Sequence, residues 1–306
     1  MKPSQVLIVV AGPTASGKSD LAINLAQKFN GELISSDSMQ VYRKLDIGTA
    51  KPTLKEQLLV PHHQIDIINP NENYSAGKYE KDTTKIIREI QSRGHIPILV
   101  GGTGLYYRAL IYGISKIPKI PELIKNKVSN LQMKYGTRHC WEQLNRNDPH
   151  SARIIHPNDT ARIIRSLEVY FSTGFSITKF QKDDPFARAR YICIAVAIEW
   201  ERDILYERIN LRTQKMLKAG WIEEVKELLK HYPKNSKPFQ SIGYREIIEY
   251  LSGKLEFNQM VQIIQQRTRR YAKRQMTWFK KESKIEWFEP YDISKVLDRI
   301  KVFLEK

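Results

Sequence analysis

The stretch VLIVVAGPTASGKS at residues 6–19 decides the fold, because it joins an unbroken apolar run to a phosphate-binding loop. Residues 12–19 satisfy the pattern G-x-x-x-x-G-K-[ST] at every required position. The apolar run predicts a buried strand, and the apolar spacing over residues 18–29 predicts an amphipathic helix. A strand before the loop and a helix after it argue against a chance match.

This loop contains the groups needed to hold the phosphates of a ligand. Inward-facing backbone N–H groups and the N-terminus of the next helix attract anions. Lys18 adds a positive charge, and Ser19 offers a hydroxyl to Mg²⁺. We predict that phosphates contact the whole loop, namely Gly12, Pro13, Thr14, Ala15, Ser16, Gly17, Lys18 and Ser19. Such loops most often serve phosphoryl transfer, which is therefore the first hypothesis.

Three further apolar runs, at residues 32–36, 96–100 and 191–198, alternate with helical patterns. This alternation is typical of a parallel sheet covered on both faces. We therefore predict an α/β fold with a P-loop-type parallel-sheet core, helices on both faces and a helical insertion domain. The chain beyond residue 199 reads as helical, with predicted helices at residues 202–219, 221–231, 244–251 and 258–281.

The predicted insertion differs in composition from the core. It is rich in charge and helical periodicity and lacks strand-like runs. Pro118 and Pro121 mark its start, and Asp183-Asp184-Pro185 mark its end. The predicted domains are therefore residues 1–115 with 190–306 for the catalytic core, and residues 116–189 for the insertion.

The composition of the chain limits which partners and which cellular compartment we expect for it. Fifty Lys and Arg against 33 Asp and Glu give a net charge of +17, which indicates a polyanionic partner such as nucleic acid unless the charge is merely solvated surface. Cys140 and Cys193 lack metal-binding spacing and argue against a disulfide framework. No run reaches the roughly 18 apolar residues of a membrane helix. We expect an unprocessed cytoplasmic monomer with no membrane association.

Two predicted strands end in residues suited to a ligand site. Asp37 follows the second strand and stands at the carboxyl edge of the sheet, where ligands bind in open α/β folds. It can accept a proton or hold Mg²⁺ through water, or simply cap a helix. The glycines of residues 101–106 follow the third strand and place Thr103 at the same edge, although they also suit an ordinary turn.

Paired arginines suggest phosphate contacts in two other places. Arg208 and Arg212 lie four apart on a predicted helix and could clamp a diphosphate. Their alternative is a solvated face with ion pairs to Asp203 and Glu207. In the insertion, Arg162 and Arg165 also share a face, and there the competing interpretation is an ion pair with Glu168.

The predicted helix near the end of the chain has no acidic residue between positions 257 and 281. Arg267, Arg270 and Arg274 share one face, and Tyr271 and Trp278 lie close by. Phosphate contacts beside flat rings are typical of RNA binding, while the aromatic residues could equally be core. The adjacent pair at residues 62–63 is assigned a structural role, because nothing completes a metal site around the two histidines.

Several motifs occur in an order that few families share. They are residues 12–19, 37–42, 47–52, 61–63, 101–106, 148–149, 158–159 with Arg162 and Arg165, 241–244, and 272–275 with 277–279. This series resembles the tRNA dimethylallyltransferases, and the resemblance covers nearly the whole chain.

The resemblance implies transfer of the dimethylallyl group of dimethylallyl diphosphate to N6 of the adenosine 3′-adjacent to the anticodon, in tRNAs that read codons beginning with U. Mg²⁺ assists and diphosphate leaves. It implies that Asp37 is the base, that Ser19 lies on the metal side, and that Arg212 and Lys18 hold the diphosphate together with Arg208. An exocyclic amine is a poor nucleophile, so base assistance and orientation are both needed.

The same resemblance implies contacts with the anticodon stem-loop. Met39, Gln40 and Tyr42 are candidates to receive the extruded base or take its place. The full set is Asp37, Ser38, Met39, Gln40, Thr103, Lys125, Ala161, Arg162, Ile163, Ile164, Arg165, Ser241, Gly243, Tyr244, Arg245, Arg270, Lys273, Arg274, Gln275 and Trp278.

Two features refine the resemblance, and three rival functions stay open. Lys125 stands where the family usually has arginine. Lysine can hold a phosphate, but not in the bidentate manner of arginine. The chain lacks the zinc-finger extension of eukaryotic relatives, so we expect a bacterial-type enzyme. The rivals are an isopentenyltransferase of free adenine nucleotides, a small-molecule kinase, and a non-catalytic RNA-binding protein. The basic helix and the insertion argue against the first, because a mononucleotide needs neither.

Overall fold

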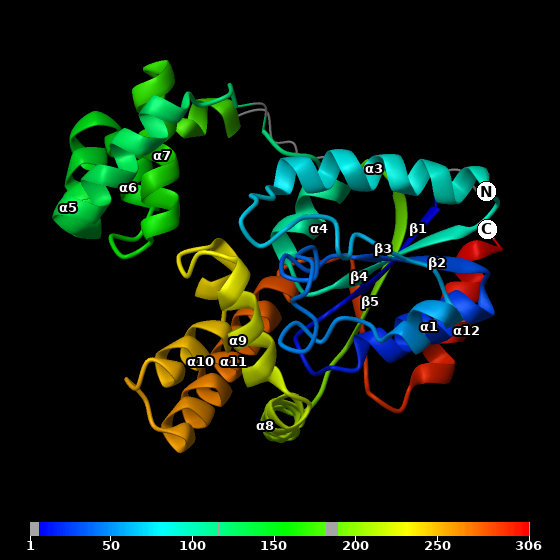
Figure 1. Cartoon of the computed structure of the whole chain (residues 1–306). Helices are drawn as coiled ribbons and strands as arrows, with labels where there is room; N and C mark the ends of the chain where they lie inside the picture. The colour runs from blue at the N-terminus through cyan, green and yellow to red at the C-terminus, as the bar shows by residue number, and fades with distance from the viewer. Residues whose placement is uncertain (1–5, 116, 182–188, 306) are drawn as a thin grey trace. The chain divides into compact units, whose positions relative to one another are not determined.

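The computed structural model describes residues 6–115, 117–181 and 189–305. The chain forms two compact units: Met1–Ile111 with Ala189–Lys306, and Tyr112–Arg188 (Figure 1). Asp183 to Pro185, the predicted end of the insertion, lies outside the described residues. None of the described helices is both long and apolar enough to cross a membrane.

The first unit contains a six-stranded parallel sheet with the order β3-β2-β4-β1-β5-β6. Its strands are β1 (Val6–Ala11), β2 (Gly31–Ser35), β3 (His62–His63), β4 (Ile96–Gly101), β5 (Ile192–Ile198) and β6 (Ile285–Phe288). The central strand β1 is buried along its whole length, as expected for a strand covered on both faces. The predicted α/β class and four of its strands are confirmed.

Two short strands were not predicted. The two residues of β3 are too few to give a period, and β6 lies in a part of the chain that was expected to be helical. The expectation of an all-helical C-terminal part was therefore wrong at β6. Its four residues stand between charged neighbours, and they pair with β5 through contacts such as Ala197 with Trp287.

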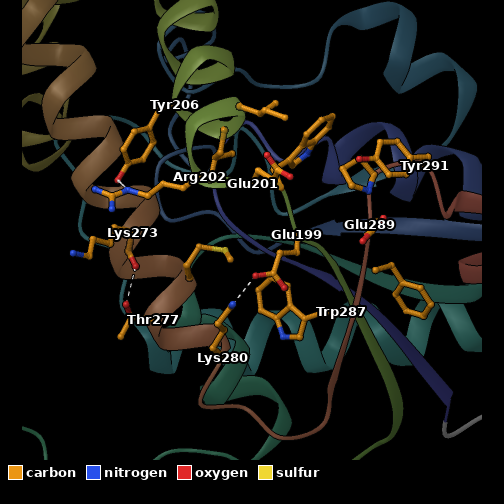
Figure 2. Close-up of a pocket in the computed structure, with 16 residues that line it drawn as sticks. Glu199, Glu201, Arg202, Tyr206, Lys273, Thr277, Lys280, Trp287, Glu289 and Tyr291 are labelled. Atoms are coloured by element: carbon orange, nitrogen blue, oxygen red, sulfur yellow. Dashed lines mark hydrogen bonds and ion pairs between the residues drawn. The ribbon is translucent and has the colours of Figure 1, made fainter.

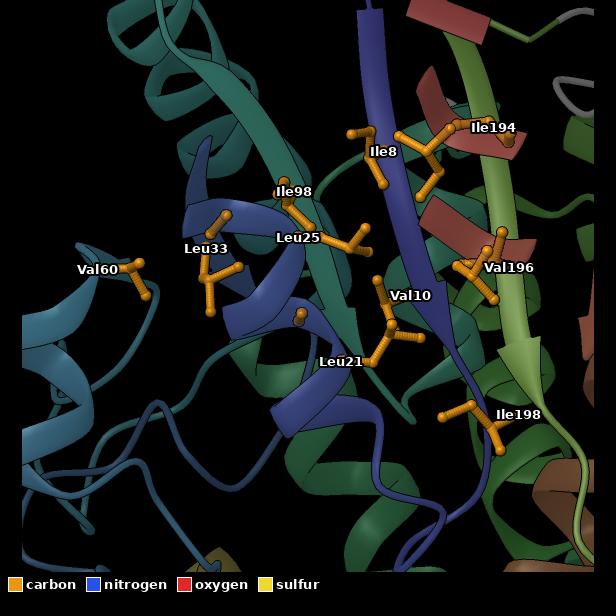
Figure 3. Packing of buried hydrophobic residues seen from close by; sticks show 14 residues of the cluster. Ile8, Val10, Leu21, Leu25, Leu33, Val60, Ile98, Ile194, Val196 and Ile198 are labelled. Carbon is orange, nitrogen blue, oxygen red and sulfur yellow. The ribbon is translucent and has the colours of Figure 1, made fainter. Parts of the chain in front are cut away.

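Helices cover both faces of the sheet (Figure 1). On one face, α1 (Lys18–Lys28) and α12 (Ile293–Leu304) pack on the strands, with Leu21 and Leu25 against Ile8 and Val10 (Figure 3). The other face carries α3 (Ala76–Ser92) and α4 (Gly104–Ile111). This packing fixes the carboxyl ends of the strands, where the phosphate loop lies between β1 and α1.

The remaining elements of this unit are mostly helices near the carboxyl edge of the sheet. Besides the short α2 (Leu54–Leu59), they are α8 (Arg202–Lys218), α9 (Trp221–His231), the 3₁₀ helix η3 (Lys237–Gln240), α10 (Tyr244–Leu251) and α11 (Phe257–Phe279). The four longer ones match the predicted helices to within a few residues, and α9, α10 and α11 each have a clear apolar face. Helix α11 packs along α8 and α10.

The regular elements of the second unit are all helical within its described residues. It consists of α5 (Glu122–Asn147), α6 (Pro149–Ile154), α7 (Thr160–Thr173) and the 3₁₀ helix η2 (Ile177–Gln181). Helix α5 is kinked at Gly136, whose φ of 79° is the left-handed conformation that glycine tolerates. A separate apolar core joins α5 to α7 through Val128, Leu144, Ile163 and Leu167, so this unit has a hydrophobic centre of its own.

Candidate functional site

The phosphate loop is braced by residues from distant parts of the chain. The backbone N–H of Thr14 donates to the side-chain oxygen of Gln275 at 2.9 Å. Trp200 donates its indole N–H to the carbonyl of Ser16 at 2.8 Å, and Arg208 donates to the carbonyl of Ala15 at 2.9 Å. The guanidinium of Arg208 also lies 4.2 Å from the ring centre of Trp200. Helices α8 and α11 therefore hold the loop in position.

Positive charges crowd beside this loop. Burial, and next the neighbouring charge of Arg212, lower the pKa of Lys18 to about 8, although Asp37 opposes the shift. Burial also lowers the pKa of Arg212, again against the effect of Asp37. One carboxylate thus faces two cations in a poorly solvated place. A bound anion would remove this imbalance, because it supplies the missing negative charge.

Asp37 lies in a turn that is held from two sides. Its Oδ1 accepts the backbone N–H of Met39 at 2.7 Å, and Ser38 donates its N–H to the hydroxyl of Thr103 at 3.1 Å. The residues after Asp37 form a turn, so the helix-cap alternative was wrong and the local contact is an Asx turn. Thr103 is thus beside Asp37, as their positions at the ends of β4 and β2 predicted.

Two cavities meet at this carboxylate. The larger, about 740 Å³, is lined by Lys18, Ser19 and Lys215, and the smaller, about 340 Å³, by Met39 and Ser241. Six residues line both: Thr14, Asp37, Thr49, Arg212, Met216 and Tyr271. Burial, and next the charge of Asp37, raise the pKa of the Tyr271 hydroxyl, so it stays protonated there. The arrangement allows two ligands to meet at Asp37 from different sides.

The basic helix α11 divides into exposed and buried positions. Arg270, Lys273 and Arg274 are exposed, which leaves the predicted phosphate contacts open to them. Gln275 is only 7% exposed and donates to the carbonyl of Gly102 at 2.9 Å. The Gln275 side chain braces the phosphate loop. It does not point outward, so the prediction that it contacts tRNA at the surface of α11 was wrong.

The aromatic residues and one arginine of α11 also serve packing. Trp278 is half-buried, with its ring against Gly104 and 4.9 Å from the guanidinium of Arg108. This is the packing role that stood as the alternative to base stacking for the aromatic residues of α11. Arg267 reaches the buried Glu246, so it does not share the exposed face.

The predicted tRNA residues of α10 and its approach lie mostly inside the protein. Gly243 and Tyr244 are buried, and the Tyr244 hydroxyl donates to Glu224 at 2.7 Å. Tyr244 and Ser241 line the smaller cavity, so they can contact only a group that enters it. Arg245 is half-exposed and bonds to Glu246 at 3.1 Å. The predicted tRNA contact by Tyr244 is thus confined to this cavity, and Gly243 does not line it.

The predicted tRNA residues of the helical unit are split in the same way. Ala161 and Arg162 are exposed, whereas Ile163 is fully buried in the core and Ile164 packs against that core. The side chain of Ile163 cannot reach a ligand, so the prediction that it contacts tRNA was wrong. Arg165 forms the alternative ion pair with Glu168 at 3.2 Å, and Lys125 pairs with Glu122 at 2.9 Å.

A few oxygen groups are available for a metal. Ser19 is exposed at the start of α1, and Asp37 lines the same cavity. Within the described ranges, no three His, Cys, Asp or Glu side chains are grouped to hold an ion. His63 contacts Glu32 at 2.6 Å, in keeping with a structural role.

A third cavity, about 710 Å³, lies at the ends of β5 and β6 (Figure 2). Lys280 contacts Glu199 at 2.5 Å there, beside the ring of Trp287 (Figure 2). Its wall also includes Trp200, which braces the phosphate loop. Sequence reasoning missed Trp200, Trp221 and Glu224, because no local motif marks residues whose partners are distant in the chain.

Comparison with known proteins gives consistent matches. Residues 40–282 match the family described as IPP transferase, and residues 5–63 match isopentenyl transferase. A curated tRNA dimethylallyltransferase of Caldanaerobacter subterraneus subsp. tengcongensis is 46% identical over 92% of this chain and 91% of its own length. One of Citrifermentans bemidjiense, tRNA dimethylallyltransferase 1, is 45% identical over 97% of each chain.

Solved structures extend the similarity to three dimensions. The tRNA isopentenylpyrophosphate transferase of Bacillus halodurans is 38% identical, covers 98% of this chain and 97% of its own, and has a TM-score of 0.74. A eukaryotic dimethylallyltransferase, described as acting on tRNA, is 32% identical over 95% of this chain and 75% of its own, with a TM-score of 0.80. Together with the site at the carboxyl edge of the sheet, these matches show that the chain belongs to the tRNA dimethylallyltransferase family of prenyl-transferring enzymes.

Proposed function

We propose that this protein transfers the dimethylallyl group of dimethylallyl diphosphate to N6 of the adenosine 3′-adjacent to the anticodon, in tRNAs that read codons beginning with U. The observation that carries the proposal is the meeting of two cavities at Asp37, with the phosphate loop beside one of them. Each cavity takes one substrate. Because one chain lines both cavities, we propose that the monomer is active. We also propose that it acts in the cytoplasm.

The diphosphate would bind in the larger cavity. Lys18 and Arg212 lie there with too few negative charges around them, and they stabilise the charge that grows on the leaving diphosphate. The hydroxyl of Ser19 would hold Mg²⁺ together with the phosphates, which leaves Asp37 for the acceptor. When bound, that ion neutralises part of the negative charge on the leaving group.

The adenine would occupy the smaller cavity, between Met39 and Ser241. Its N6 attacks C1 of the dimethylallyl group, and a C–N bond forms while the C1–O bond breaks. The electron pair of that broken bond leaves on the diphosphate, and the proton of N6 passes to the carboxylate of Asp37. Thr103 supports this step by holding the turn that contains Asp37.

The tRNA would be held by exposed basic residues outside the cavities. On α11 these are Arg270, Lys273 and Arg274. We propose that the helical unit at residues 112–188 grips the stem-loop as a second contact, through exposed residues such as Arg162. An enzyme of free adenine nucleotides would need neither surface, which favours tRNA as the acceptor.

The test is to mix the protein with Mg²⁺, dimethylallyl diphosphate and unmodified tRNA, and to measure the isoprenoid on adenosine by mass spectrometry. Asp37→Ala should abolish product and leave tRNA binding nearly unchanged. Asp298→Ala, an exposed position on α12, is the matched control and should behave as wild type. Equal loss of product and tRNA binding in Asp37→Ala would mean that Asp37 is structural, and transfer of phosphate from labelled ATP would favour a kinase.

A further inference from the structure

Glu224, on helix α9, binds a loop of the sheet core through consecutive backbone N–H groups. Its Oε2 accepts from Asp46 at 2.8 Å and from Ile47 at 2.6 Å. Its Oε1 accepts from Gly48 at 3.2 Å and from the hydroxyl of Tyr244 at 2.7 Å. One carboxylate therefore satisfies four donors from two different parts of the chain. Hydrogen bonds to a charged acceptor are stronger than neutral ones.

The same loop is fixed at its other end by a buried lysine. Lys51 is 8% exposed, and its ammonium contacts Asp46 at 2.5 Å and Asp66 at 2.6 Å. It also donates to the carbonyl of Tyr42 at 3.0 Å. Gln40 donates to the carbonyl of Ala50 at 3.1 Å. The core thus holds the loop through Lys51 and Gln40, and Glu224 ties residues 46–48 to α9 and α10.

This loop forms part of the wall of the smaller cavity. Gly48 and Thr49 line it together with Trp221 and Tyr244, while Asp46, Ile47 and Thr49 line the larger cavity. The Cα of Gly48 lies so close to the helices that an added Cβ would stand 2.0 Å from the indole nitrogen of Trp221. Burial, and next the charge of Glu224, raise the pKa of the Tyr244 hydroxyl, which keeps its proton available to donate.

We propose that Glu224 is a positioning residue, which sets the width of the smaller cavity by holding residues 46–48 against α9 and α10. The inference rests on the proposed function, in which that cavity takes the adenine. Glu224 does not itself line the cavity or the phosphate side. Its loss should therefore misplace N6 relative to Asp37 and slow the transfer step, while Lys18 and Arg212 still hold the diphosphate.

The test compares Glu224→Gln with Glu223→Gln, an exposed neighbour on the same helix, in single-turnover reactions with enzyme in excess. Glu224→Gln keeps the size of the side chain but turns an NH₂ group toward N–H donors. We expect its rate constant to fall about tenfold with full product amplitude, since small misplacement slows transfer. The KM for dimethylallyl diphosphate should stay within about twofold of wild type, because the hydrogen bonds of Glu224 go to Asp46, Ile47, Gly48 and Tyr244 and not to the cations that hold the diphosphate. Hydrogen exchange of residues 46–50 should rise.

The outcomes separate positioning from folding and from the proposed function. A fall in amplitude with an unchanged rate constant would mean that Glu224 only stabilises the fold. Wild-type rate and wild-type hydrogen exchange in Glu224→Gln would overturn the inference. If wild type and Glu223→Gln gave no isoprenoid product at all, the proposed function would fail. The hydrogen exchange of residues 46–50 in Glu224→Gln would still show separately whether Glu224 holds residues 46–48, and unchanged exchange would mean that it does not.

Discussion

Two clusters of charge lie at opposite edges of the same sheet, and they are built in opposite ways. At the amino edge, the buried carboxylate of Glu32 contacts His63 and His95 at 2.6 Å each and Arg93 at 2.8 Å. Burial opposes its ionisation, yet these hydrogen bonds outweigh burial and lower the pKa of Glu32 to about 2. This carboxylate has all the partners it can use.

The carboxyl edge has the reverse arrangement. Lys18 and Arg212 crowd around Asp37, burial is not compensated, and the pKa of Lys18 falls to about 8. A cluster whose charges are matched stabilises the fold, whereas one with unmatched charge is completed by a ligand. The comparison teaches that electrostatic imbalance, more than the number of charged groups, marks the functional edge.

The largest effect should come from removing the charge beside the phosphate loop. Lys18→Ala should lower kcat/KM about 10²-fold to 10³-fold, because an anion-stabilising group in a poorly solvated site is lost. Steady-state assays with dimethylallyl diphosphate and tRNA measure it. Lys28→Ala, exposed at the end of the same helix, is the control. A decline in both variants would mean that the assay reports helix stability.

A substitution in the cluster around Glu32 should instead change the stability of the fold. Glu32→Gln removes the buried carboxylate that contacts Arg93, His63 and His95, and should lower the free energy of unfolding by about 2 kcal/mol. Urea unfolding measures this, with the exposed Glu89→Gln for comparison. Activity at low temperature should persist. Lost activity with unchanged stability would reverse the contrast between the edges.

The acid side of the stability profile tests the same cluster. Because the pKa of Glu32 is lowered from 4.5 to about 2, its contribution is complete above pH 4.5 and is lost as pH falls toward 2. Unfolding free energies of wild type should therefore drop faster over that interval than those of Glu32→Gln. Parallel profiles for the two proteins would remove Glu32 from the acid sensitivity.

The unmatched cluster should make donor binding sensitive to alkali. The charged Lys18 binds diphosphate, and its pKa in the free protein is about 8. Below pH 8 Lys18 is already charged, and diphosphate binds without taking up a proton. Above pH 8 Lys18 must gain a proton on binding, so the affinity for diphosphate should fall by up to about tenfold per pH unit. Calorimetry with diphosphate and Mg²⁺ measures the profile. Lys18→Arg stays charged and should give a flatter one, so equal slopes would assign the titration to another group.

The smallest effect should come from the exposed face of α11. Replacing Arg270 and Arg274 with Ala should weaken tRNA binding several-fold and reduce its salt dependence by about one logarithmic unit per phosphate contact. Fluorescence anisotropy over a range of salt measures both. Arg269→Ala is the comparison, because that side chain is engaged with Asn210 at 2.7 Å. An unchanged salt slope in the double variant would exclude this face from tRNA binding.

Much of the core could be predicted because its signals are local. The apolar run at β1, the glycines of the loop and the apolar faces of α9, α10 and α11 each lie within one window of sequence. The two missed strands show the limit, since β3 and β6 gain their stability from pairing with β2 and β5. Burial of Ile163 and Gln275 could not be predicted either, because it depends on neighbours far away in the chain.

By itself, the sequence determined the phosphate loop, the α/β class, the family and the carboxyl edge where Asp37 and Thr103 stand. The reason is that strand order and backbone pattern place the ends of parallel strands together. The tertiary structure alone decided which basic residues are exposed, that Trp200, Arg208 and Gln275 brace the loop, and that Glu224 holds residues 46–48. Those contacts join residues far apart in the chain, and no local pattern specifies them.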